Sequence, residues 1–189
     1  GKPSVTQLLN GTLMEYLKIT NDFYESPYDM SYRVQGTKVH SGLEQQDDEL
    51  SLQEEQFSEG ITGKPDCLEI ENGITTLYDF KTSAAYKIKK ALGICKVEIP
   101  TDQVFKSGPR KGQPKMLSEY RKTDKSDMKD WILQVNRYRI FFEVAGFKVD
   151  RMVIEAFLKD YNMAKNTKIV GYVLRPIELI EVPFMPNAE

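Results

Sequence analysis

The chain of 189 residues has very little cysteine and histidine: Cys67, Cys95 and His40 are all that it contains. The two cysteines form no CxxC or comparable ligand spacing, so four-cysteine ligation of zinc or an iron–sulfur cluster by this chain is excluded and two free thiols are predicted. No apolar run approaches the roughly 18–20 residues of a membrane span. The N-terminus lacks the layout of a signal peptide. We therefore expect no membrane contact and a cytoplasmic location.

The chain also lacks a nucleotide-driven motor, because no G-x-x-x-x-G-K-[ST] phosphate loop is present. A net charge of −2 excludes a globally basic nucleic-acid binder. The charges are unevenly placed, however. Residues 47–59 contain six Asp and Glu with no Lys or Arg, whereas residues 106–125 contain seven Lys and Arg against two acids. A local basic stretch can bind phosphates even when the whole chain is acidic.

Hydrophobic periodicity and turn residues predict helices and strands in alternation. We expect helices over 4–18 (with Ser4 as cap), 33–46, 82–92 and 127–145, the last capped by Ser126 or Asp127 and ended by Gly146. Strands are expected over 52–62, 68–71, 74–81, 149–158 and 168–174. Residues 21–32 connect elements, and the Gly- and Pro-rich residues 93–125 are predicted to form a long mobile loop. The order predicts an α/β fold: one domain over 1–189, with a central mixed sheet flanked by helices.

Asn72-Gly73 lies between two alternating runs and predicts a hairpin with a two-residue turn. Pairing outward from this turn places Asp66 directly opposite Asp79, with Lys81 on the same face. Opposed carboxylates repel each other, and a bound Mg²⁺ would turn that cost into a binding site because it prefers oxygen ligands. Removing Asp79 is then expected to leave the metal-free fold intact or slightly more stable. The alternative is a surface Asp79–Lys81 pair with Asp66 in a turn after Pro65.

Four short motifs occur in order along the chain: Gly36-Thr37-Lys38-Val39-His40, Gly63-Lys64-Pro65-Asp66, Asp79-Phe80-Lys81-Thr82-Ser83 and Gln134-Val135-Asn136-Arg137-Tyr138. Together they resemble the motifs of the PD-(D/E)XK nuclease superfamily, and within it the RecB-like branch. The resemblance implies a restriction-endonuclease-like core and a Mg²⁺- or Mn²⁺-dependent deoxyribonuclease. It implies that Asp66 and Asp79 bind the metal with the Phe80 carbonyl and His40, and that Lys81 is catalytic. Relatives with iron–sulfur clusters carry cysteines that this chain lacks, so no such cluster is expected.

Gln134 and Tyr138 are four residues apart on the strongest predicted helix and therefore share a face. The resemblance assigns them to the rim of the active site, where the amide can orient Lys81 or a scissile phosphate and the phenol can contact substrate. The alternative is a core tyrosine with a glutamine at its edge. His40 has a similar alternative, because a lone histidine on a helix is more often a structural residue.

The resulting hypothesis is an exonuclease on DNA ends or single strands, acting in recombination, repair or phage replication, with any helicase or recombination protein supplied separately. Exonuclease is preferred to endonuclease by family analogy alone. Two other functions stay open: a catalytically silent nucleic-acid-binding subunit, and a metal phosphohydrolase of small phosphate esters. Candidate nucleic-acid contacts, against the alternative of a solvated basic loop, are Lys111, Lys115, Arg121 and Lys122.

Overall fold

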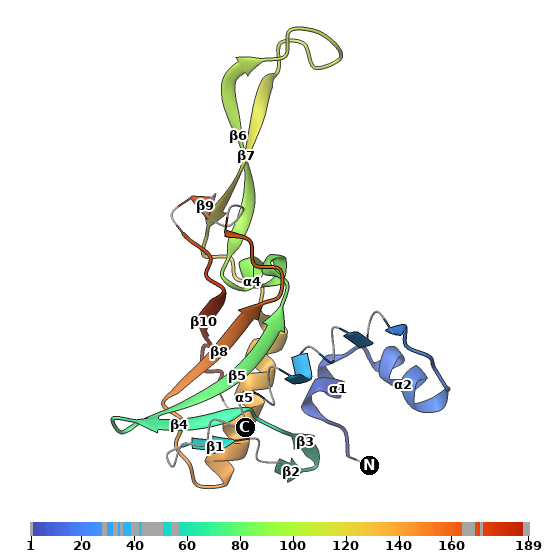
Figure 1. The fold of residues 1–189 in the computed structure, drawn as a ribbon, viewed down its shortest axis with the longest axis vertical. Coiled ribbons are helices and arrows are strands. Elements are labelled where there is room, and N and C mark those ends of the chain that lie inside the picture. The colour runs from blue at the N-terminus through green and yellow to red at the C-terminus, as the bar shows by residue number, and fades with distance from the viewer. Residues whose placement is uncertain are drawn as a thin grey trace. The chain divides into compact units, whose positions relative to one another are not determined.

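A computed structural model describes residues 2–27, 30–31, 34, 36–38, 42, 51–53, 57–163, 169–170 and 172–186. The chain divides into two compact units (Figure 1). Unit 1 comprises Gly1–Thr82, Lys129–Phe157 and Leu179–Glu189, and unit 2 comprises Ser83–Met128 and Leu158–Glu178. Helices and strands alternate along the chain, which confirms the predicted α/β class. In the part of the chain that the structure describes, no helix is long and apolar enough to cross a membrane.

The main sheet has five strands in the order β1-β4-β5-β8-β10. Its strands are β1 (Ser51–Gln53), β4 (Cys67–Glu71), β5 (Ile74–Ser83), β8 (Arg151–Leu158) and β10 (Ile177–Glu181). β4 is antiparallel to both β1 and β5. The backbone N–H of Asp150 donates to Thr75 at the start of β5. That of Lys159 donates to Ser83 at its end, so β8 runs parallel to β5. The predicted central mixed sheet is therefore confirmed.

The β4–β5 hairpin turns where the sequence predicts. Asn72 and Gly73 have φ values of 51° and 78°, which the two central positions of a type I′ turn require. The pairing runs from Glu71↔Ile74 outward to Cys67↔Tyr78 in the predicted register. Leu68 and Leu77 form one of its rungs, and both are fully buried. Burying this face fixes the register, because a slip of one residue would expose every core side chain on it.

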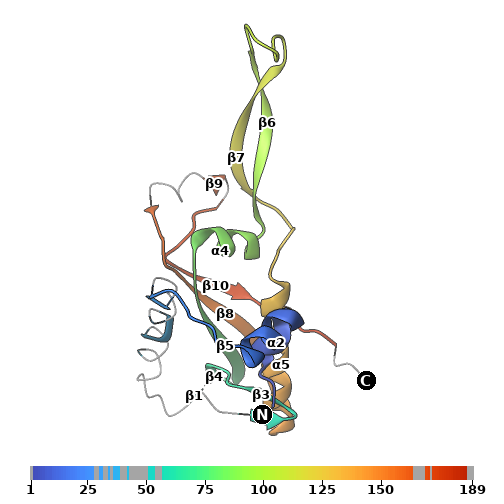
Figure 2. The ribbon, with the colours of Figure 1, turned by 90° about the vertical axis from the view of Figure 1, so that its right-hand side faces the viewer.

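The long helix α5 (Lys129–Val144) lies along the sheet of unit 1 (Figure 2). Its end confirms the prediction for Gly146, which has a φ of +94°. Gly146 N–H donates to Glu143 O at 3.1 Å, and Phe147 N–H donates to Phe142 O at 2.9 Å. These two bonds form a Schellman motif, and the edge-on contact of Phe142 with Phe147 is the hydrophobic contact that accompanies it. At the other end α5 begins at Lys129, so neither Ser126 nor Asp127 directly precedes it as predicted, and the Ser126 hydroxyl donates to Ala91 O at 2.7 Å.

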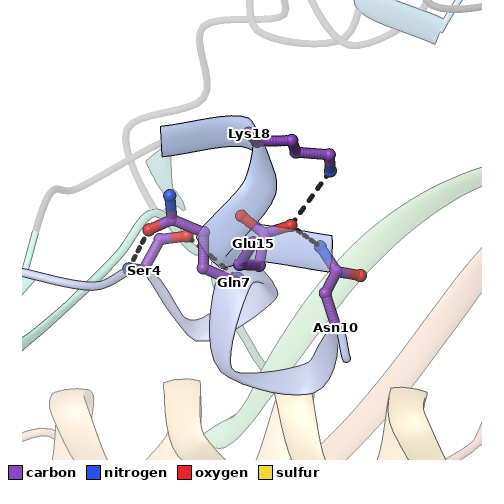
Figure 3. Close-up of polar contacts among 5 residues, drawn as sticks. All are labelled: Ser4, Gln7, Asn10, Glu15 and Lys18. Atoms are coloured by element: carbon purple, nitrogen blue, oxygen red, sulfur yellow. Dashed lines mark hydrogen bonds and ion pairs between the residues drawn. The ribbon is translucent and has the colours of Figure 1, made fainter. Parts of the chain in front are cut away.

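The N-terminal region contains two helices, α1 (Val5–Leu9) and α2 (Thr12–Thr20), where the sequence predicts one. Ser4 caps α1 as predicted, in a capping box with Gln7 (Figure 3). The break falls at Asn10-Gly11, both of which have extended backbone conformations. Asn10 donates instead to Glu15 at 2.8 Å, and Lys18 donates to the same carboxylate oxygen. The prediction of one continuous helix is therefore wrong, because Asn10 and Gly11 favour non-helical conformations.

The strand predicted over 52–62 is also wrong as a single element. It is divided into β1, β2 (Phe57–Glu59) and β3 (Ile61–Gly63), with β2 and β3 paired around Gly60. Gly60 has a φ of +76°, which favours a turn over a continuing strand. The helix predicted over 33–46 falls mostly outside the described residues, and so does His40.

Unit 2 contains α4 (Ala85–Ala91) and a second sheet of β6 (Ile94–Val104), β7 (Pro114–Lys122) and β9 (Ile169–Val170). The loop predicted over 93–125 is therefore wrong in its secondary structure: β6 and β7 form a long antiparallel hairpin. Its prolines occupy positions that strands tolerate. β6 is an edge strand, where Pro100 breaks no ladder on its outer side, and Pro114 begins β7. The mobility of this segment stays a prediction.

The C-terminal part of the sheet differs from expectation as well. The strand predicted over 168–174 is reduced to the two residues of β9, and β10 was not predicted. β10 buries Glu178 while Leu179 is 64% exposed, so its pattern does not indicate a strand with an apolar face. The Glu178 carboxylate accepts hydrogen bonds from the Tyr172 hydroxyl and the Arg175 N–H, which compensates its burial. Cys67 and Cys95 form no disulfide and remain thiols, as predicted.

Candidate active site

Asp66 and Asp79 lie at the end of the β4–β5 ladder in unit 1. The last paired rung is Cys67↔Tyr78, so the next positions outward are Asp66 and Asp79, as the register predicts. The Asp66 Oδ2 atom accepts a hydrogen bond of 2.7 Å from the backbone N–H of Phe80. This bond ties the Asp66 carboxylate to the residue that follows Asp79. The hairpin therefore brings together Asp66, which directly precedes β4, and Asp79, which lies within β5.

Lys81 completes this cluster. Its Nζ lies 2.6 Å from Asp79 Oδ2, and the exposed fractions of the two side chains are 21% and 1%. Burial lowers the pKa of Lys81, but the charge and hydrogen bond of Asp79, together with the charge of Asp66, outweigh it, so the pKa is raised. Lys81 is therefore protonated at neutral pH. Two carboxylates and one ammonium leave a formal charge of −1, the sign that would attract a cation.

Gln134 and Tyr138 enter the same region from α5. Gln134 Nε2 donates to the Tyr138 hydroxyl oxygen at 2.8 Å, so the phenolic proton can be donated to another acceptor. Burial raises the pKa of Tyr138, and the Gln134 hydrogen bond partly opposes it. Asp79 and Asp66 raise this pKa further and Lys81 lowers it, so the phenol lies within electrostatic range of the whole cluster. The structure thus brings together five of the residues that the sequence singled out.

Gly63 contributes in a way that the motif alone did not indicate. A Cβ atom at this position would lie 2.5 Å from Phe141 Cε2 and 3.0 Å from Tyr138 Cε1. The absence of a side chain therefore allows α5 to approach β3 closely. The rings of Tyr138 and Phe141 are stacked with centroids 6.3 Å apart. Gly63 thus helps to set the position of the phenol, which sequence periodicity could not reveal because the contact joins residues 63 and 138–141.

The donor set of this cluster suits a hard divalent cation. Asp66 and Asp79 offer carboxylate oxygens and Phe80 offers a backbone carbonyl, the ligand types that Mg²⁺ and Mn²⁺ prefer. The Phe80 side chain is turned toward Phe157, with ring centroids 6.5 Å apart, and so takes no part in the acidic cluster. Across the described ranges, no group of three or more His, Cys, Asp and Glu side chains is close enough to form a metal site. His40, the fourth expected ligand, lies outside those ranges.

The four residues predicted to contact nucleic acid belong to unit 2 and differ in their surroundings. Arg121 donates twice to Glu119, at 3.0 and 3.1 Å. Lys122 Nζ lies 4.7 Å from the centroid of the Tyr172 ring. Lys111 and Lys115 lie near the end of the β6–β7 hairpin, and all four residues are exposed. The first two cations therefore have contacts within unit 2, although all four face solvent.

Comparison with known proteins gives no family. No family model matches the chain, and no curated protein matches it. A solved structure described as "Crystal structure of SSO0001" is similar, with 12% sequence identity and a TM-score of 0.35. The match covers 85% of this chain and 55% of that one.

Proposed function

We propose that this protein is a metal-dependent nuclease of the PD-(D/E)XK type that hydrolyses DNA phosphodiester bonds. The observation that supports it most is the convergence of Asp66, Asp79 and Lys81 at one end of the β4–β5 hairpin. Tyr138 of α5 lies within electrostatic range of that cluster and accepts a hydrogen bond from Gln134. Two acids, a protonated lysine and a buried phenol are what phosphodiester cleavage needs for cation binding and charge stabilisation.

Each residue has a distinct part in the proposed reaction. Asp66, Asp79 and the Phe80 carbonyl, with His40, would hold Mg²⁺ or Mn²⁺, which when bound polarises the phosphate and activates a water. Lys81 carries the positive charge that stabilises negative charge on the phosphate as the transition state forms. Gln134 holds the Tyr138 hydroxyl oxygen, which leaves its O–H directed to substrate.

Binding of DNA is assigned to unit 2, which has a clear excess of Lys and Arg. Attraction between these cations and phosphates compensates for the acidic surroundings of the cluster in unit 1. The family resemblance favours an activity on DNA ends, in recombination, repair or phage replication. It would take place in the cytoplasm, and another protein would supply any helicase that is needed. The same proposal includes a restriction-endonuclease-like core and a place in the RecB-like branch for this protein.

The test is a cleavage assay on end-labelled single- and double-stranded DNA and on closed circles, with Mg²⁺ or Mn²⁺. We expect metal-dependent loss of linear substrate, no cleavage in EDTA, and resistant circles if the enzyme is an exonuclease. Asp79→Asn should be inactive, whereas the matched control Glu71→Gln, on an exposed residue of β4, should cleave normally. Cleavage that persists in EDTA or in Asp79→Asn would remove the proposal. DNA binding without cleavage by the unaltered protein would favour the silent-subunit alternative.

A further inference from the structure

The far end of the β6–β7 hairpin, residues 100–116, packs against very little. We call it the distal hairpin. All of its residues are exposed except Thr101 and Phe105, which are half-buried. Val104 and Met116 are apolar and still 48% and 49% exposed. A two-stranded ribbon without a packed face is only marginally stable in water, so burial does not explain why this segment forms.

Local hydrogen bonds nevertheless give the distal hairpin a defined shape. The pairing register shifts between Pro100 and Val104, and the Thr101 hydroxyl donates to Lys115 O at 2.8 Å across this bulge. At the turn, Phe105 N–H donates to Gln113 O and Gly112 N–H donates to Phe105 O, both at 3.0 Å. The result is an ordered ribbon end with its side chains directed to solvent.

The charge of the distal hairpin indicates the kind of partner. It carries four cations (Lys106, Arg110, Lys111 and Lys115) against the single acid Asp102, and no acidic residue occurs from Gln103 to Ser118. Cations concentrated on an exposed ribbon attract a polyanion, and the proposed function makes nucleic acid the relevant one.

The composition of the distal hairpin distinguishes duplex from single-stranded nucleic acid. Unpaired bases are bound by stacking on exposed aromatic rings. Phe105 is the only aromatic residue in this segment, and it is half-buried with the Arg110 guanidinium 5.7 Å from its ring centroid. The distal hairpin therefore offers cations for phosphates and no exposed ring for bases.

Groove dimensions then favour one mode of binding. Two paired strands are about 4.8 Å apart, and their side chains extend the ribbon to roughly 10 Å. The major groove of B-DNA is about 12 Å wide and admits a two-stranded ribbon, whereas the minor groove is about 6 Å wide. We propose that the distal hairpin is a duplex-DNA arm that lies in the major groove, with Lys106, Arg110, Lys111 and Lys115 on the flanking phosphates. This inference rests on the proposed nucleic-acid function and adds the form of DNA that the arm binds.

The experiment measures equilibrium binding of labelled DNA in Ca²⁺, on an Asp79→Asn background so that no chemistry occurs. Lys111→Gln with Lys115→Gln should weaken duplex binding and reduce the slope of log affinity against log salt by about 2, because each lost phosphate contact removes roughly 0.9. The control pair, Lys90→Gln with Lys96→Gln, removes the same charge at the base of the hairpin. Those two lysines already lie 3.8 and 3.9 Å from Asp127 and Glu98, so the control should change the slope little.

A shortened variant gives an independent measurement. Ile99 and Leu117 are directly paired, so residues 100–116 can be replaced by Asn-Gly as a two-residue turn. We expect an unchanged thermal midpoint, at least tenfold weaker duplex binding and little change on single strands. Duplex with bulky glucosyl groups in its major groove should bind the full-length protein weakly, whereas a minor-groove ligand should not compete.

Three results would contradict the proposal of a duplex-DNA arm. They are equal losses of affinity for single- and double-stranded DNA, normal binding to the glucosylated duplex, and a salt slope in the control pair that matches that of the Lys111 and Lys115 variant. If the shortened variant, with Asp79 intact, still cleaved DNA and bound duplex normally, the duplex-DNA arm would be contradicted and the nuclease proposal would stand. Failure of cleavage by the intact protein would instead contradict the nuclease proposal, because the binding assay does not depend on chemistry.

Discussion

Unit 1 and unit 2 carry opposite charge. Unit 2 has 15 Lys and Arg against 7 Asp and Glu, a net of +8, whereas unit 1 has 11 against 21, a net of −10. The overall charge of −2 conceals this separation. A cation site needs acidic ligands, and the same acids repel the DNA backbone. Placing the attraction in a different unit resolves this conflict, so cleavage and binding should respond to different substitutions.

Asp79→Ala should cause the largest loss of activity, and the functions of unit 2 should not change. We expect cleavage to be abolished while duplex binding in Ca²⁺ is unchanged. The free energy of unfolding should fall by about 3 kcal/mol, because the largely buried Lys81 ammonium loses its partner. The sequence alone led to the opposite expectation, relief of carboxylate repulsion, because it did not show the 2.6 Å contact with Lys81.

Urea unfolding and the cleavage assay, measured on the same preparations, test this prediction. Glu71→Gln removes a carboxylate from the same hairpin at an exposed position and should match the wild type in both. A stabilised Asp79→Ala protein would show that repulsion from Asp66 outweighs the ion pair. Loss of duplex binding in Asp79→Ala would show that cleavage and DNA binding are not separated between the two units.

Lys81→Ala should separate catalysis from binding within unit 1. Its charge serves the transition state more than the ground state, because negative charge builds on the phosphate only as the nucleophile attacks. We expect single-turnover cleavage to fall by about 10²–10³-fold with DNA and metal affinity little changed. Gln134→Ala should behave as a milder version through its hydrogen bond to Tyr138. Equal losses of binding and cleavage in Lys81→Ala would make Lys81 a phosphate anchor.

Gly63→Ala should damage the site indirectly. The new Cβ would lie 2.5 Å from the Phe141 ring, and overpacking of this kind costs about 1–3 kcal/mol. We expect a lower thermal midpoint and slower cleavage, with both partly restored by Phe141→Leu. Gly11→Ala is the control, because a Cβ at Gly11 meets nothing within 4 Å. A Gly63→Ala protein with wild-type stability and activity would show that α5 shifts freely.

The smallest expected effect is a loss of stability at alkaline pH, which depends on a residue of unit 2. Burial and the hydrogen bond to Glu178 raise the pKa of Tyr172 to about 12, above its unfolded value of 10.0. The folded state therefore holds this proton more tightly, so its contribution to stability is complete below pH 10 and is lost as pH rises toward 12. Tyr172→Phe should be less stable than wild type at pH 8, and the difference should shrink by pH 11.5. Chemical denaturation at both pH values measures it, and a constant difference would contradict the assignment.

Local signals in the sequence were reliable where one turn or cap decided the structure. Asn72-Gly73 fixed the β4–β5 hairpin and, through its register, the positions of Asp66 and Asp79. Gly146 ended α5. The same local reasoning failed for β6–β7, because glycine and proline predict a loop unless an edge strand accommodates them. It also missed β10, whose buried Glu178 depends on Tyr172 and Arg175.

The amino-acid sequence was sufficient to predict which acids oppose each other and which residues share a face of α5, because strand register and helical spacing are set over a few residues. The folded structure was needed to show that Lys81 and Asp79 form a largely buried pair rather than a surface pair, that Tyr138 lies within electrostatic range of both, and that Gly63 makes room for Phe141. It also decided that the charges divide between two units. The contacts of Tyr138 and Gly63 join residues far apart in the chain, and the energy of the Lys81–Asp79 pair depends on burial and distance, which no local pattern records.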